Sequence, residues 1–259
     1  MTDPPTFLAL LWGTLALRPY VFIFLIVFLV AGARDLGPAR TVGFLLWGWA
    51  VAFASEYAST RIGVPFGLYH YTGSTMGREL YLSNVPLFDS LSFPFLAYAA
   101  YCLARRALGA ARGAHVILLA GAMMMLLDMV IDPLAVRGAR WFLGEIFYYP
   151  AGGVYFGVPL SNFLGWALVG WVIVGGYVWA SGVAAGPAGP GIGLYYGVLC
   201  FNLMITMWIG EWTLAGAGIL VHVIGFLIMC GLKGARPLPP AGGSPASRNG
   251  AGAGGTDSR

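Results

Sequence analysis

The sequence predicts an all-α protein, a polytopic bundle of about seven transmembrane helices with two long, aromatic-rich loops on one face. Hydrophobic residues make up 59% of the 259-residue chain and charged residues only 9%, whereas soluble domains carry about 25% charged residues. The mean hydropathy is +0.78, and several apolar stretches approach the roughly 20 residues that cross a bilayer as a helix. These observations exclude a water-soluble globular domain.

Candidate spans follow one another along the chain, and the apolar stretches place them at residues 19–33, 41–57, 90–107, 114–131, 161–181, 191–209 and 213–231. Residues 6–17 are also apolar, and they either extend the first span or lie on the membrane surface. Six and eight spans are therefore the alternatives to seven. The 39 glycines fit this fold class, because small residues let membrane helices approach closely.

The chain divides into a transmembrane helical domain at residues 1–233 and a tail at residues 234–259. The tail consists mainly of Gly, Pro, Ala and Ser, with few charged residues. It lacks the apolar surface that a folded segment would bury, so we expect it to be disordered.

The basic residues predict the orientation of the spans. Seven spans place nine of them on the side of the C-terminus, namely Arg34, Arg40, Arg105, Arg106, Arg112, Lys233, Arg236, Arg248 and Arg259. Five lie on the opposite side, namely Arg18, Arg61, Arg78, Arg137 and Arg140. Because Lys and Arg are concentrated in cytoplasmic loops, we expect a protein of the cytoplasmic (inner) membrane with its C-terminus in the cytoplasm.

Two connections between the predicted spans, residues 58–89 and 132–160, are unusually long, since loops beyond about 12–15 residues are uncommon. Both are rich in aromatic residues, namely Phe66, Tyr69, Tyr71, Tyr81 and Phe88 in the first and Trp141, Phe142, Phe147, Tyr148, Tyr149, Tyr155 and Phe156 in the second. Both fall on the same, outer face in the seven-span arrangement. They form either an interfacial aromatic belt or ordered caps over a cavity.

Carboxylates are the most informative polar residues. Six of them map near the face that carries the long loops, namely Glu56, Asp89, Asp128, Asp132, Glu145 and Glu211. Acidic residues at membrane depth are costly and by default indicate function. Asp128 and Asp132 are four residues apart, so both can face one side of a helix.

Several of these acids also have a structural interpretation. Asp89 has the position of an N-cap for the third span, and Asp132 precedes a proline that could end its helix. Glu211 could be a solvated turn residue. Glu56 and Asp128 follow directly on apolar sequence, so a functional role is favoured for both.

Other chemistries are disfavoured by the residues present. The three histidines, His70, His115 and His222, form no metal-ligand pattern, and no nucleotide-binding motif is found. A retinal Schiff base needs a lysine within a helix, but Lys233 ends the last span. The scattered basic residues do not indicate nucleic-acid binding. We therefore expect no cofactor and no metal.

The candidate functional groups that remain are carboxylic acids and aromatic rings at the edge of the lipid. This combination suits an apolar substrate. A buried carboxylic acid can donate a proton near neutral pH, and each ring stabilises a cation by about 0.5–2 kcal/mol. Such a set could protonate an alkene. A transporter could use the same carboxylates as a proton relay.

Four ordered motifs give the sequence a resemblance to a known family. They are SEYASTRIGVPFGLYHY at residues 55–71, VPLFDSLSF at 85–93, DMVIDP at 128–133 and YFGVPLSNFLGW at 155–166. Together they resemble the CruF-type carotenoid hydratases. The resemblance implies a membrane enzyme of carotenoid biosynthesis that adds water to the terminal double bond of an acyclic end group and leaves a tertiary alcohol. It implies substrates with lycopene-type or γ-carotene-type ends or C50 precursors, and no redox cofactor.

We infer the site roles from the residues themselves. The carotenoid enters from the lipid bilayer, and Asp128 or Glu56 protonates its alkene. Asp132 or Glu56 then takes a proton from the attacking water. The expected substrate-binding residues are Tyr69, Tyr71, Trp141, Tyr155, Asn162 and Trp166, with Asn162 bonded to the water or to the product hydroxyl.

Two other functions remain open. A carotenoid cyclase also begins by protonating an alkene but closes a ring, and a membrane transporter or carotenoid-binding protein would change no pigment. The sequence does not indicate an oligomeric state.

Overall fold

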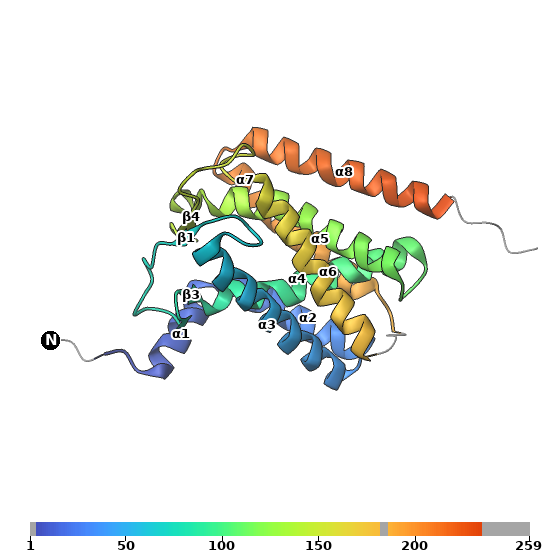
Figure 1. Cartoon of the computed structure of the whole chain (residues 1–259), viewed down its shortest axis with the longest axis horizontal. Helices are drawn as coiled ribbons and strands as arrows, with labels where there is room; N and C mark the ends of the chain where they lie inside the picture. The colour runs from blue at the N-terminus through green and yellow to red at the C-terminus, as the bar shows by residue number, and fades with distance from the viewer. Residues whose placement is uncertain (1–3, 182–185, 235–259) are drawn as a thin grey trace, which may run out of the picture.

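Long apolar runs become helices here because a helix satisfies every backbone polar group within its own segment. The computed structural model describes residues 4–181 and 186–234. Within these ranges the helices are α1 (Phe7–Leu17), α2 (Pro19–Asp35), α3 (Pro38–Ile62), α4 (Leu87–Leu108), α5 (Ala114–Ala135), α6 (Leu160–Ser181), α7 (Gly189–Trp208) and α8 (Trp212–Gly234). The protein is therefore mostly helical, and α2 to α8 form an elongated bundle (Figure 1).

The expected count of seven membrane spans is not established. Five of the described helices, α4 to α8, are long and apolar enough to cross a membrane, and the number rises to six if the bent pair α1 and α2 is one span. The 25-residue helix α3, expected to be a span over residues 41–57, is not among them. The tail expected to be disordered at residues 234–259 lies outside the described residues apart from Gly234, which ends α8.

Two prolines affect the helix boundaries differently. The axes of α1 and α2 meet at 88° at Arg18, directly before Pro19, because a proline ring obstructs a helix that would continue through it. Residues 7–17 therefore form a separate helix and do not continue α2 in a straight line. Pro133, in contrast, lies inside α5. The interpretation that Asp132 marks a helix end is therefore wrong, and its side chain belongs to the last turn of α5.

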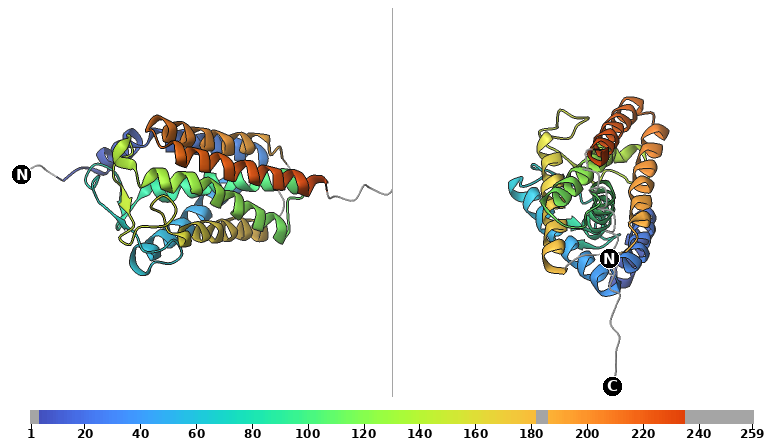
Figure 2. Two further views of the ribbon diagram at one scale, coloured as in Figure 1. Left: turned by 90° about the horizontal axis from the view of Figure 1, so that it is seen from above. Right: turned by 90° about the vertical axis from the view of Figure 1, so that its right-hand side faces the viewer.

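Helix α4 forms the centre of the bundle. It packs against α2, α3, α5, α6, α7 and α8, and the other helices are arranged around it (Figure 2, right). Most of its side chains are buried, including Ser90, Phe93 and Tyr98. The buried polar residues of this helix, such as Ser90 and Arg105, therefore face protein rather than lipid or water.

The two long connections meet at one end of the bundle (Figure 1). Strand β1 (His70–Tyr71) of the first pairs antiparallel with β4 (Phe147–Tyr148) of the second, so that Tyr71 lies opposite Phe147. The hydroxyl of Thr72 extends this contact by donating to the carbonyl of Glu145 at 2.6 Å. The first connection also forms a hairpin from β2 (Tyr81–Leu82) and β3 (Val85–Pro86). The pairing of β1 with β4 therefore ties the two connections together.

Helix α1 and the break after it hold the first connection in place. The backbone N–H of Leu80 donates to Thr14 Oγ1 at 2.8 Å, and the guanidinium of Arg18 pairs with Glu79 at 3.2 Å. Both charged side chains are almost fully buried. The N-terminal helix is therefore connected to the loop end of the bundle.

Candidate active site

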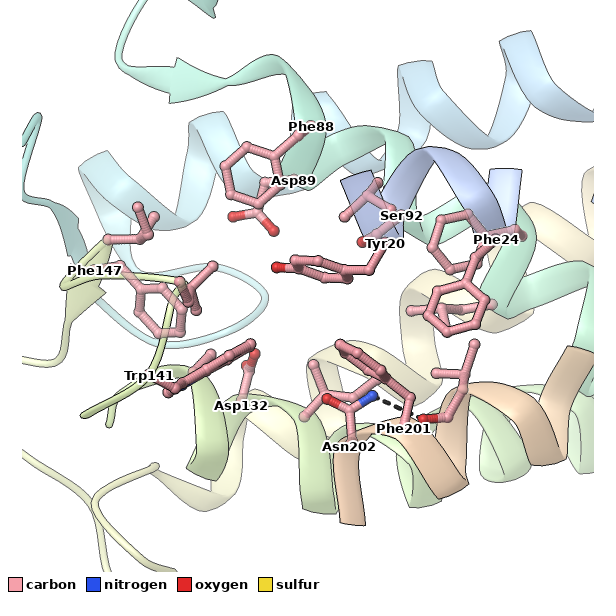
Figure 3. A pocket seen from close by; sticks show the side chains of 18 of the residues that line it. Tyr20, Phe24, Phe88, Asp89, Ser92, Asp132, Trp141, Phe147, Phe201 and Asn202 are labelled. Carbon is pink, nitrogen blue, oxygen red and sulfur yellow. Dashed lines mark hydrogen bonds between the residues drawn. The ribbon is translucent and has the colours of Figure 1, made fainter. Parts of the chain in front are cut away.

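An apolar cavity of about 90 Å³ lies at the loop end of the bundle, between α2, α4, α5, α7 and the second connection (Figure 3). Aromatic side chains dominate its lining, including Tyr20, Phe24, Phe95, Trp141, Phe147 and Phe201. The polar side chains in the lining include Asp89, Ser92, Asp132 and Asn202. Figure 3 shows Asp89 and Asp132 on opposite sides of the cavity. The cavity is suited to an apolar ligand with a reactive centre near the two carboxyl groups.

A second, smaller cavity of about 30 Å³ adjoins the first. Its lining includes Glu56, Asp89, Asp132 and Asn162, together with aromatic rings such as Tyr149. This volume holds roughly two water molecules, and the site offers the polar partners that buried water needs.

Four residues line both cavities: Asp89, Asp132, Phe147 and Trp166. Asp89 comes from the first turn of α4 and Asp132 from the last turn of α5. The two carboxyl groups therefore border an apolar space on one side and a more polar space on the other.

Asn162 connects two carboxyl groups of α5. Its Nδ2 donates to Asp128 Oδ2 at 2.6 Å and to Asp132 Oδ2 at 2.7 Å, which uses both hydrogens of the amide nitrogen. The indole N–H of Trp166 also donates to Asp132 Oδ2, at 3.3 Å. Asp128 is fully buried and is not part of the lining of either cavity, and its hydrogen bond with Asn162 connects it to the site.

Tyr71 connects two further carboxyl groups. Its hydroxyl lies 2.6 Å from Asp89 Oδ2 and 3.1 Å from Glu56 Oε1, and the Tyr69 hydroxyl lies 3.3 Å away. Ser90 donates a short hydrogen bond to the other oxygen of Glu56. Burial of the hydroxyls, reinforced by the nearby carboxylates, raises the pKa of Tyr69 and of Tyr71 above its usual range. Both phenols therefore keep their protons and can serve as donors.

These four carboxyl groups have hydrogen bonds but no cationic partner in the described part of the chain. The ion pairs found there join Arg18 to Glu79, Arg105 to Asp35, and Arg137 and Arg140 to Glu211. Within residues 4–181 and 186–234, no group of three or more His, Cys, Asp or Glu side chains could hold a metal ion. The expectation of a metal-free, cofactor-free site remains a prediction.

The structure brings most of the expected site residues to one place. Glu56, Tyr69, Asn162 and Trp166 line the small cavity, and Trp141 lines the apolar one. Tyr155 is not part of either lining; it packs against Phe156 and Phe163, and its hydroxyl has no hydrogen-bond partner among the described residues.

Sequence reasoning missed two residues of the site. Asp89 was interpreted as an N-cap, but Pro86 holds that position and Asp89 instead bonds Tyr71 and lines both cavities. The sequence did contain one signal for Asp89, because it is one of the six acidic residues that map to the face with the long loops. Tyr20, which lines the apolar cavity, carried no such signal because it lies in an apolar stretch.

Comparison with known proteins identifies the family. A family model described as carotenoid biosynthesis protein matches residues 11–226. A bisanhydrobacterioruberin hydratase from Haloarcula japonica is 33% identical over 171 residues, which cover 64% of this chain and 55% of that relative. The matched segment thus spans about half of the relative's length. No solved structure matches the chain. Because the family model matches most of its length, the chain belongs to the carotenoid biosynthesis protein family.

Proposed function

We propose that this protein is a carotenoid hydratase that adds water across the terminal double bond of an acyclic end group. The observation that carries the proposal is the junction of the two cavities at Asp89 and Asp132. Hydration of an alkene needs an apolar space for the hydrocarbon, a polar space for water and an acid between them. The family match and the name of the Haloarcula relative support the same reaction.

The apolar cavity would receive the end group, whether from lycopene, γ-carotene or a C50 precursor. Its aromatic lining matches the hydrocarbon chemistry of such an end group. The small cavity would hold the water. The reaction needs no redox cofactor, because adding water changes no oxidation state overall.

Protonation of the alkene is the first step. The neutral carboxyl group of Asp89 gives its proton to the less substituted carbon, and the π electrons form the new C–H bond. This leaves a carboxylate on Asp89 and a tertiary cation on the other carbon. Rings of Tyr20, Trp141 and Phe147 stabilise this cation by about 0.5–2 kcal/mol each, and Asp132 across the cavity adds fixed negative charge.

Capture of the cation by water completes the reaction. The water comes from the small cavity, where the carbonyl oxygen of Asn162 can accept one of its hydrogens. Its oxygen forms the C–O bond, and Glu56 takes the released proton. The product is a tertiary alcohol, and the atoms balance as alkene plus water.

This assignment gives Asp128 a different role from the one expected from the sequence. It is hydrogen-bonded to Asn162 and takes no part in either cavity lining. Asp128 therefore positions Asn162, and Asp89 replaces it as the proton donor.

Pigment analysis in a lycopene-producing host tests the proposal. We expect the wild-type chain to add one water per hydrated end, and Asp89→Asn and Asp132→Asn to lower product formation by about 100-fold or more. Glu145→Gln removes an exposed carboxyl group of the second connection and should retain full activity.

Three outcomes would count against the proposal. Full hydration by both aspartate variants would refute the assigned reaction centre. A product of unchanged mass would indicate cyclisation. Absence of any change with lycopene, γ-carotene and C50 acyclic ends would indicate transport or binding.

A further inference from the structure

Tyr71 bridges two carboxyl groups that border different spaces. Asp89 lines both the apolar and the small cavity, whereas Glu56 lines only the small one. The Tyr71 hydroxyl contacts Asp89 at 2.6 Å and Glu56 at 3.1 Å. A continuous hydrogen-bonded path therefore runs from the proposed water space to the proposed proton donor.

Proton counting makes this path more than a structural bridge. A phenol has one hydrogen to donate, but Tyr71 contacts two carboxyl groups. When it donates to one, the other contact is satisfied by a carboxylic proton that points at the phenol oxygen. The arrangement thus accommodates one carboxylic acid and one carboxylate, and either carboxyl group can be the acid.

Hydration creates a need for such a path. After one turnover, Asp89 has given its proton to carbon, and the proton released by water lies on Glu56. The next turnover requires that proton on Asp89 again.

We infer that Tyr71 returns the proton from Glu56 to Asp89 after each turnover, and this inference rests on the proposed hydratase function. The carboxyl of Glu56 gives its proton to the phenol oxygen while the phenol hydrogen moves to Asp89 Oδ2. One O–H bond breaks and one forms at each end, and Tyr71 remains a neutral phenol. Tyr71 is therefore a positioning residue that acts through Asp89.

The local structure holds Tyr71 in place for this role. It ends β1, opposite Phe147 of β4, and the two rings contact each other with centroids 6.4 Å apart. Phe147 itself lines both cavities. Ser90 fixes the far oxygen of Glu56, so both ends of the path are held by neighbouring residues.

A comparison of first and later turnovers tests the inference. With purified protein in lipid and an acyclic carotenoid, Tyr71→Phe should leave the single-turnover rate within about threefold of wild type. It should lower the steady-state rate by about tenfold or more, because only the return of the proton is impaired. The progress curve should then show a burst of one product per site.

Two further variants keep the test decisive. Ser90→Ala removes the hydrogen bond that holds Glu56 at the other end of the same path, so it should lower the steady-state rate more than the single-turnover rate, even if Tyr71→Phe does not fold. Tyr148→Phe, an exposed tyrosine on the neighbouring strand, should behave as wild type.

The inference fails if single-turnover and steady-state rates fall by the same factor in Tyr71→Phe and Ser90→Ala, or if neither rate changes. A wild-type protein that hydrates no acyclic carotenoid would instead refute the proposed function. The two failures are therefore distinguishable.

Discussion

A single carboxamide, that of Asn162, uses both of its amide hydrogens on carboxyl groups one helical turn apart. We predict that Asn162→Ala lowers the free energy of unfolding by about 1–3 kcal/mol, because buried acceptors lose their donor. Thermal unfolding in detergent measures the effect. Asn84→Ala, which removes only an exposed contact with Arg61, is the control. Equal melting temperatures for the two variants would contradict the prediction.

Asp128 provides a second test at the residue scale. Asp128→Asn preserves an oxygen that can accept the hydrogen bond from Asn162, so we predict less than a tenfold loss of hydration, against about 100-fold for Asp89→Asn. Initial rates with the same carotenoid measure both. A larger loss for Asp128→Asn would restore Asp128 as the proton donor.

The sequence located most of these residues but not all of their partners. Glu56 and Asp128 could be identified because a carboxylate beside apolar sequence is unusual, and Asp132 because it lies four residues from Asp128. Asp89 could not, because Asp-Ser-Leu after a loop has the local pattern of an N-cap, and its contact with Tyr71 spans 18 residues. A Tyr–carboxyl contact of this kind arises only from tertiary packing.

The close packing of α5 and α6 gives a prediction at the element scale. A Cβ added at Gly121 would lie 2.6 Å from the carbonyl oxygen of Ala167, and one at Gly170 would lie 2.9 Å from Gly121 Cα. We predict that Gly121→Ala destabilises the protein by about 1–3 kcal/mol through overpacking. Gly197→Ala, with nothing within 4 Å, should be neutral or slightly stabilising. Thermal unfolding compares them, and the reverse order would contradict this packing.

The buried ion pair of Arg18 and Glu79 gives a second prediction at the element scale. Removing one partner leaves a buried charge unpaired, so we predict that Arg18→Met and Glu79→Met each cost about 3–5 kcal/mol. Replacing both, as Arg18→Met with Glu79→Met, should recover part of that loss. A double-mutant cycle by thermal unfolding measures the coupling. Additive losses would show that the pair does not anchor the first connection.

Apolar runs predicted the helices well, but their exact ends depended on features that local patterns leave ambiguous. Pro19 ends α1, whereas Pro133 is accommodated within α5. The pairing of β1 with β4 was not predictable, because two-residue strands leave no periodic pattern in the sequence. That pairing positions Tyr71, so the least predictable element is also part of the site.

For the whole molecule, polar networks lie at both ends of the bundle. At the end away from the two cavities, Asp35 of α2 accepts hydrogen bonds from Arg105 at 2.5 Å and from Tyr98 at 3.2 Å, both on α4. This buried network joins an outer helix to the central one. The cavities at the loop end can therefore be altered by substitution while α2 remains attached to α4 at the other end.

The basic residues predict an orientation for the bundle, because the seven-span arrangement places nine of them on the side of the C-terminus and five on the side of the two long connections. Arg34, Arg40, Arg105, Arg106 and Arg112 lie in or beside the turns opposite the two long connections, and Lys and Arg are concentrated on the cytoplasmic side. We therefore predict that the cavity end faces away from the cytoplasm.

Thiol labelling in intact cells tests this orientation. In a background with Cys200 and Cys230, the exposed native cysteines, replaced by alanine, Glu145→Cys marks the loop end and Arg112→Cys the opposite end. Both positions are exposed. A membrane-impermeant maleimide should label Glu145→Cys in intact cells and Arg112→Cys only after permeabilisation, because a charged reagent does not cross the bilayer. The opposite pattern would place the carboxyl groups near the cytoplasmic face, and the proposed water cavity would then be supplied from the cytoplasm.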